Sequence, residues 1–320
     1  MKPDGTGMRK LTRRLPGINS PEWSPNGARI AFVRDRPYEW SPNALVYVIR
    51  ADGSHMRRVG FGHSPRWSPD GRHLMFVDAH GLYEAPAGDS PPATGRIVVV
   101  DVASGRRHVI GRGEAPAWSS DGKRVAFVRY DLTKEHSWYP DASRLLTMKP
   151  DGSAVRVLKA PEPASPYVLY DPKWSPDGRT IAVWTEEICD QCEPAPEAGY
   201  IQLIDAETGK TRGLLKPDGP FAWSPDGKLL ALTGFRIGVR TIDVATAAVT
   251  VLVWGGIEAS WSPNGGQIGF VRCTGENSDR CYVYAVNADG SRLRRLVQTS
   301  KYTPVDRWTG EPVGSFDWGR

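Results

Sequence analysis

The pentapeptide Trp174-Ser175-Pro176-Asp177-Gly178 predicts the fold of this chain, because six copies of it occur along the sequence. Asn replaces Asp in the first and last copies, and Ser replaces Pro in the third. The copies are 38 to 56 residues apart and begin at Trp23, Trp67, Trp118, Trp174, Trp223 and Trp261. A regular period of this length indicates a repeat architecture.

Each pentapeptide predicts a hairpin turn between two β-strands. Pro presets φ, Asp or Asn hydrogen-bonds to the local backbone, and Gly takes a positive φ. A short β-prone run follows each copy, as at Ile30–Val33 and Val125–Val128. A second hairpin follows in every unit, centred on Gly53 in the first and on Ala245–Ala247 in the fifth. Each unit therefore carries four short strands, named A to D outward from the Trp strand.

Such units predict an all-β fold, a β-propeller of four-stranded antiparallel blades. A four-stranded unit cannot bury both of its faces alone, so neighbouring units stack around an axis, with the Trp side chains filling the gaps between them. The 34 Gly and 27 Pro among 320 residues disfavour a helical bundle. We expect one propeller domain over residues 1–320, with blades starting near residues 18, 62, 113, 168, 218 and 257.

The two ends of the chain leave the number of blades open. Residues 1–12 repeat the end of a unit and Phe316–Trp318 repeat the start of one, which predicts terminal strands at residues 8–12 and 314–318. The favoured interpretation is a ring of six complete blades, to which these terminal strands are additions. The alternative is a seven-bladed ring whose entry strands and leader lie upstream of Met1. This alternative would explain why the residues from Met1 onward show no apolar secretion signal.

The combination of Trp-Ser-Pro-Asp-Gly, a strand, Ala51-Asp52-Gly53-Ser54 and a basic pair resembles the TolB-like propeller repeat, a relative of the WD repeat. The resemblance covers nearly the whole chain and implies a propeller. It leaves the function open, because the same repeat serves periplasmic scaffolds, propeller caps of prolyl-oligopeptidase-like enzymes and lyase-like enzymes.

The connections predict one binding face. Turns A–B and C–D are short and uniform, whereas the B–C connections differ in length and share a face with the D–A connections. Loops on a rigid scaffold are frequent recognition sites, although their aromatic residues can also serve only to pack the loops onto the blades. The candidates on this face are Tyr38, Trp40, His63, His80, Tyr83, Trp138, Tyr139, Tyr167 and Tyr170.

The four cysteines fall into two local pairs, Cys189 with Cys192 and Cys273 with Cys281, each in a B–C hairpin. Two disulfides are the favoured interpretation, which implies an oxidising compartment, periplasmic or extracellular. The alternatives are free thiols, a zinc site that would require two separated loops to converge, and a redox pair without a thioredoxin-like context.

The charges indicate neither nucleic-acid binding nor a membrane span. The net charge of +5 is modest, and the basic pairs, such as Arg57-Arg58, are distributed around the outer strands, where they discourage edge-to-edge association. No run of 18 apolar residues occurs. The six histidines show no metal-ligand spacing, so we expect no metal and no cofactor.

The sequence lacks the motifs of several enzyme classes. It contains neither G-x-S-x-G nor H-E-x-x-H, and the Asp residues of the repeat belong to turns. We therefore expect a non-catalytic, monomeric scaffold that binds a protein or peptide through the B–C and D–A face. One alternative is a carbohydrate-active or lyase-like enzyme with His, Arg and carboxylates around the channel. Another is the regulatory propeller subunit of a hydrolase complex.

Overall fold

The computed structural model describes residues 11–12, 17–34, 44–78, 94–131, 142–160, 167–187, 199–213, 220–234, 238–274 and 280–298. These residues form 24 strands and no helix. The first three blades contain β1 (Ile18–Trp23), β2 (Arg29–Arg34), β3 (Leu45–Arg50), β4 (Arg57–Phe61); β5 (His63–Trp67), β6 (His73–Asp78), β7 (Arg96–Asp101), β8 (Arg107–Arg112); β9 (Glu114–Trp118), β10 (Val125–Asp131), β11 (Ala142–Met148), β12 (Arg156–Lys159). The other three contain β13 (Tyr167–Trp174), β14 (Thr180–Glu187), β15 (Tyr200–Asp205), β16 (Thr211–Gly213); β17 (Phe221–Trp223), β18 (Leu229–Gly234), β19 (Gly238–Asp243), β20 (Val249–Val253); β21 (Ile257–Trp261), β22 (Gln267–Thr274), β23 (Arg280–Asn287), β24 (Arg294–Gln298).

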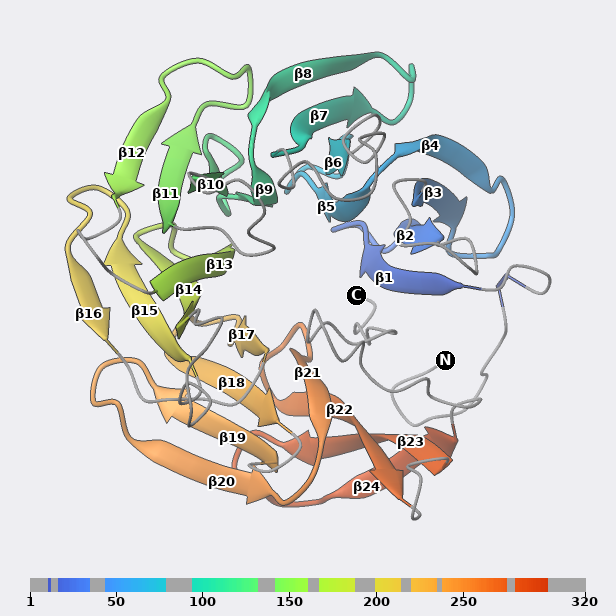
Figure 1. Ribbon diagram of the computed structural model, residues 1–320. Helices are drawn as coiled ribbons and strands as arrows, with labels where there is room; N and C mark the ends of the chain where they lie inside the picture. The colour runs from blue at the N-terminus through green and yellow to red at the C-terminus, as the bar shows by residue number, and fades with distance from the viewer. Residues whose placement is uncertain are drawn as a thin grey trace, which may run out of the picture.

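The strands form six antiparallel sheets arranged as a ring, which confirms the predicted β-propeller (Figure 1). Each sheet is a simple meander in which consecutive strands are paired. The first strand of every sheet lies toward the centre of the ring, and the fourth lies at the rim (Figure 1). Within the described residues the structure therefore has six complete blades. Of the expected terminal strands, residues 8–10 and 314–318 lie outside the described ranges, and Leu11 and Thr12 are not in a strand.

Every residue of the repeated pentapeptide has a structural role. Blade 4, the sheet of β13 to β16 when the blades are numbered in chain order, shows these roles. The hydroxyl of Ser175 donates to Asp177 Oδ1 at 2.6 Å and accepts a hydrogen bond from the Thr180 amide at 2.9 Å. Gly178 takes φ +69°, which L side chains rarely adopt, and its amide donates to the Ser175 carbonyl. Pro176 contacts the next blade, since a Cβ added to Gly227 would lie 3.3 Å from its Cδ. The turns therefore also join neighbouring blades.

The tryptophan of the repeat is a hydrogen-bond donor between blades. The indole Nε1 of Trp174 donates to the carbonyl of Ala117 in blade 3 at 3.2 Å. Ala117 is the residue before the Trp of its own blade, and the next blades repeat this bond. Trp223 donates to the Lys173 carbonyl at 3.0 Å, and Trp261 donates to the Ala222 carbonyl at 3.1 Å. Blades 2 and 3 follow the same pattern. This series of bonds explains why the inner strands require Trp rather than Phe.

The hydrophobic core lies between the blades. Five clusters of buried side chains each join one blade to its successor, from blades 1 and 2 to blades 5 and 6. Phe127 of blade 3, for example, packs with Ile97 of blade 2 and is fully buried. Because a single sheet could not bury these side chains on both faces, the blades are stable only in contact with their neighbours.

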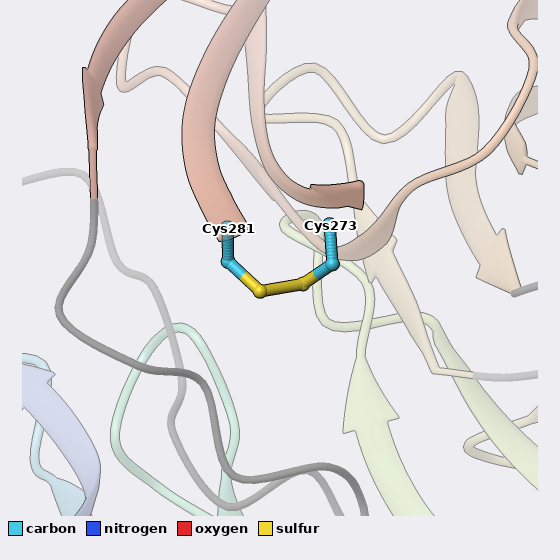
Figure 2. The surroundings of a disulfide bond; sticks show 2 residues. All are labelled: Cys273 and Cys281. Carbon is cyan, nitrogen blue, oxygen red and sulfur yellow. A yellow bond between two sulfur atoms is a disulfide. The ribbon is translucent and has the colours of Figure 1, made fainter. Parts of the chain in front are cut away.

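The last blade contains the predicted disulfide between Cys273 and Cys281 (Figure 2). The two residues face each other in adjacent strands β22 and β23, with their Cα atoms 4.0 Å apart. Their bond closes the hairpin at the B–C connection. The other predicted pair, Cys189 and Cys192, lies outside the described residues.

Candidate functional site

The inner strands contain a β-bulge three residues before the Trp. In five of the six blades a residue other than Gly takes a positive φ at this position: Ser20, Ser64, Ala115, Asp171 and Glu258, with φ from 45° to 57°. The pairing register with the second strand shifts at the same place. A bulge redirects side chains locally and is a common feature near binding sites. The inner strands line the centre of the ring, so the bulges surround the axis (Figure 1).

Four charged residues on these strands form what we term the axial charge cluster: Glu22, Arg66, Asp171 and Lys173. Arg66 of blade 2 is 3.6 Å from Glu22 of blade 1 and 3.8 Å from Asp171 of blade 4. It therefore reaches past blade 3, whose equivalent residue is the small Ala117. The cluster joins blades 1, 2 and 4, and blade 4 is adjacent to neither of the other two.

The charges of this cluster compensate one another. Lys173 Nζ is 2.9 Å from Asp171 Oδ2, and it also donates to the carbonyl of Phe221 in blade 5 at 2.6 Å. Burial alone would raise the pKa of Asp171, but the positive charges of Lys173 and Arg66 hold that pKa below its usual value. Glu22 Oε1 accepts a hydrogen bond from the Trp67 amide at 2.9 Å.

A second polar pair, His63 and Glu114, lies where the inner strands of blades 2 and 3 begin. His63 Nε2 is 3.7 Å from Glu114 Oε2, and Glu114 Oε1 accepts a hydrogen bond from the Gly95 amide at 2.7 Å. The side chain of Glu114 is 19% exposed, and burial raises its pKa to about 7 despite the opposing effect of that hydrogen bond. Burial also lowers the pKa of His63. Glu114 can therefore exchange a proton near neutral pH, and the effect of burial favours the neutral form of His63.

Aromatic side chains lie on the same face as this pair, which we term the mouth face because the B–C and D–A connections meet there. The rings of Tyr130 and Tyr170 lie 6.0 Å apart, at the boundary of blades 3 and 4. Trp254 follows β20 in the connection between blades 5 and 6 and is 66% exposed, with the Arg240 guanidinium 5.9 Å from its ring centre. The mouth face therefore combines titratable, charged and aromatic groups.

The structure describes only part of the predicted binding face. Tyr170 and His63 lie in the inner strands β13 and β5, not in connections, because pairing with the second strand continues on the N-terminal side of the bulge. Tyr167 begins β13, and only its backbone is described. The remaining candidates lie outside the described residues: Tyr38, Trp40, His80, Tyr83, Trp138 and Tyr139.

Sequence reasoning missed the axial charge cluster, Glu114 and Trp254. A signal for the cluster was present, since the residue before each repeated Trp is Glu22, Arg66 and Lys173 in three blades and small in the others. Within the described ranges, no three His, Cys, Asp or Glu side chains gather as metal ligands. A search of the same residues finds no helix with the length and apolarity needed to cross a membrane.

The ring of six blades defines the class of protein, a TolB-like β-propeller in fold, and confirms the expected resemblance. No protein-family model matches the chain. The Tol-Pal system protein TolB of Alcanivorax borkumensis is 34% identical over 150 residues, 46% of this chain and 30% of that protein. The uncharacterized peptidase YuxL of Bacillus subtilis is 29% identical over 123 residues, 37% of this chain and 16% of that protein. The matched segments thus span less than a third of either relative.

Solved structures of different function share the fold. TolB from Acinetobacter baumannii has a TM-score of 0.56 at 21% identity, covering 86% of this chain and 64% of that one. Oligogalacturonate lyase from Vibrio parahaemolyticus has a TM-score of 0.62 at 15% identity, covering 91% and 79%. Acylaminoacyl peptidase from Pyrococcus horikoshii has a TM-score of 0.60 at 14% identity, covering 88% and 46%. At these identities the likeness establishes the fold alone.

Proposed function

We propose that this propeller is a non-catalytic scaffold that binds a protein or peptide partner through the mouth face. The observation that carries the proposal is the exposure of Trp254, 66% of whose surface is accessible on that face. Large aromatic side chains are enriched among the residues that dominate binding energy at protein interfaces. Tyr130 and Tyr170 add a further aromatic pair on the same face.

The axial charge cluster supports binding more than catalysis. A general base works best with a pKa near the operating pH, whereas Lys173 and Arg66 oppose the effect of burial and keep the pKa of Asp171 low. Such paired charges suit the positioning of a polar partner segment at the axis. The disulfide between Cys273 and Cys281 supports an extracytoplasmic location, where such bonds persist.

Site-specific photo-crosslinking tests the proposed face. Benzoylphenylalanine placed at Trp254 is expected to capture a partner in cells, because this position is exposed on the mouth face. The matched control places the same group at Lys123, an exposed residue of an A–B turn on the opposite face. Equal capture from both positions, or capture from Lys123 alone, would contradict the proposal. A hydrolase as the captured partner would assign the chain as a regulatory propeller subunit.

The second candidate is an enzyme that acts on an acidic carbohydrate at the channel mouth. The observation in its favour is the pair of His63 and Glu114, 3.7 Å apart, in which Glu114 has a pKa of about 7. A group with such a pKa can remove a proton near neutral pH. Incubation with oligogalacturonate would release unsaturated uronates, detected by ultraviolet absorbance, and Glu114→Gln would abolish the release. No release from the unsubstituted protein excludes this substrate.

A further inference from the structure

A groove at the junction of blades 2 and 3 is separate from the axial charge cluster. It has a volume of about 790 Å³ and is open to solvent. The residues that line it come from the approach to β7, from β7 and β8 of blade 2, and from β10 of blade 3. They are Thr94, Arg96, Val109, Ile110, Gly111, Arg112 and Arg129.

Three arginine residues therefore line one groove, and among the described residues a carboxylate pairs with only one of them. Arg96 is 3.0 Å from Asp78. Arg129 instead donates to the backbone carbonyl of Arg112 from Nε and Nη2, at 3.4 and 3.2 Å. Within the part of the chain that the structure describes, no carboxylate lies within ion-pair distance of Arg112 or Arg129. Two positive charges in the groove thus have no carboxylate partner among the described residues, which favours an anionic ligand.

The rest of the lining favours a polypeptide as the source of that anion. Val109 is 54% exposed and adjoins the buried Ile110, so the groove offers apolar surface beside its charges. Among the described strands the outer strand β8 pairs only with β7, so no described strand occupies its other edge, and an extended segment could add there. Among the described lining residues there is no aromatic ring, the usual platform for a sugar or a nucleobase.

We propose that this groove binds an acidic peptide segment in an extended conformation. Carboxylates of the segment pair with Arg112 and Arg129, and its apolar side chains cover Val109. In an extended peptide with alternating acidic and apolar residues, the acidic side chains lie on one face and the apolar side chains on the other. This alternation matches an arrangement in which one kind contacts the arginines and the other covers Val109. The inference goes beyond the proposed function, because it assigns a second site and a ligand chemistry that do not involve Trp254 or the axial charge cluster.

Fluorescence anisotropy with a labelled short peptide of alternating Glu and Val tests the inference. We expect the unsubstituted chain to bind this peptide. It should show no measurable binding of the matched peptides in which Gln or Lys replaces Glu. Added salt should weaken the binding, because the groove is open to solvent. The Arg112→Gln variant should raise the Kd about tenfold, and the double variant with Arg129→Gln should raise it further.

The control variant is Arg106→Gln, which removes the same charge from an exposed position at the other end of blade 2. It should leave the Kd unchanged. Arg112 is the primary test because only its backbone carbonyl makes a hydrogen bond to Arg129, so the substitution leaves that bond intact. Binding that persists in Arg112→Gln, or that falls equally in Arg106→Gln, overturns the site. Binding of oligogalacturonate with the same arginine dependence, without binding of the acidic peptide, overturns the assigned ligand.

Discussion

Trp174 fills the space between two blades and also donates a hydrogen bond, and substitution can separate the two roles. Its side chain is 8% exposed and packs in the cluster that joins blades 3 and 4. Its indole donates to the Ala117 carbonyl, and the Arg124 guanidinium lies 4.7 Å from its ring centre. The contribution of the repeated Trp to stability is therefore partly apolar and partly polar.

Trp174→Phe should lower the free energy of unfolding by about 2 kcal/mol, because it removes one buried hydrogen bond and leaves a small cavity. Urea denaturation followed by circular dichroism measures the change. Trp254→Phe is the matched control, and we expect it to stay within about 0.5 kcal/mol because Trp254 is 66% exposed. A similar loss in both variants would refute the interblade role of Trp174.

Glu114→Gln should change the dependence of stability on pH. The native pKa of Glu114 is about 7, above the ordinary value of 4.5, so the folded chain holds a proton that the unfolded chain has released. Stability therefore falls as the pH rises through this window, by about 3 kcal/mol for a shift of this size. From about pH 5 to about pH 8, the variant should gain about 2.5 kcal/mol of that amount relative to the unsubstituted chain.

Urea denaturation at both pH values measures this gain. The lowered pKa of His63 has the opposite effect in the unsubstituted chain, since stability falls as the pH drops through its ordinary value of 6.5. Comparing Glu114→Gln with the unsubstituted chain separates the two groups. A difference in unfolding free energy that is the same at both pH values would show that Glu114 is not protonated in the folded state.

At the scale of the element, the hairpin of β22 and β23 is closed by the disulfide. Reduction, or the Cys273→Ser and Cys281→Ser double variant, should cost about 2–3 kcal/mol, the value expected for a short closed loop. Denaturation with and without reductant measures the cost. The reductant should have no effect on unfolding of the double variant, and any effect there would have to arise from other cysteines.

The elements and the candidate site differ in how far they could be predicted from the sequence. The strands and turns were predictable because each pentapeptide makes its own hydrogen bonds, as between Ser175 and Asp177. The contact of Arg66 with Asp171 was not, because it depends on where the ring places blades 2 and 4. The pKa of Glu114 depends likewise on burial by residues distant in sequence. Trp254 lacks the repeat signature, so its exposure required the structure.

For the whole molecule, the ring geometry predicts a radial gradient of local stability. The outer strand β16 consists entirely of exposed residues, whereas the core residues of β14, two strands further in, are buried. Backbone amides in exposed edge strands open more readily than those in packed strands. Hydrogen exchange should therefore be fastest in the outer strands β16 and β20 and slowest in β14 and β18. Uniform exchange across a blade would contradict this gradient.

The indole bonds between blades all have the same direction, since at each of the five junctions from blades 1 and 2 to blades 5 and 6 the later unit supplies the donor and the earlier unit the acceptor. A unit added by gene duplication brings both partners with it. Such an insertion leaves no unpaired polar group between blades. The number of blades can therefore increase without new hydrogen-bonding residues at the interface.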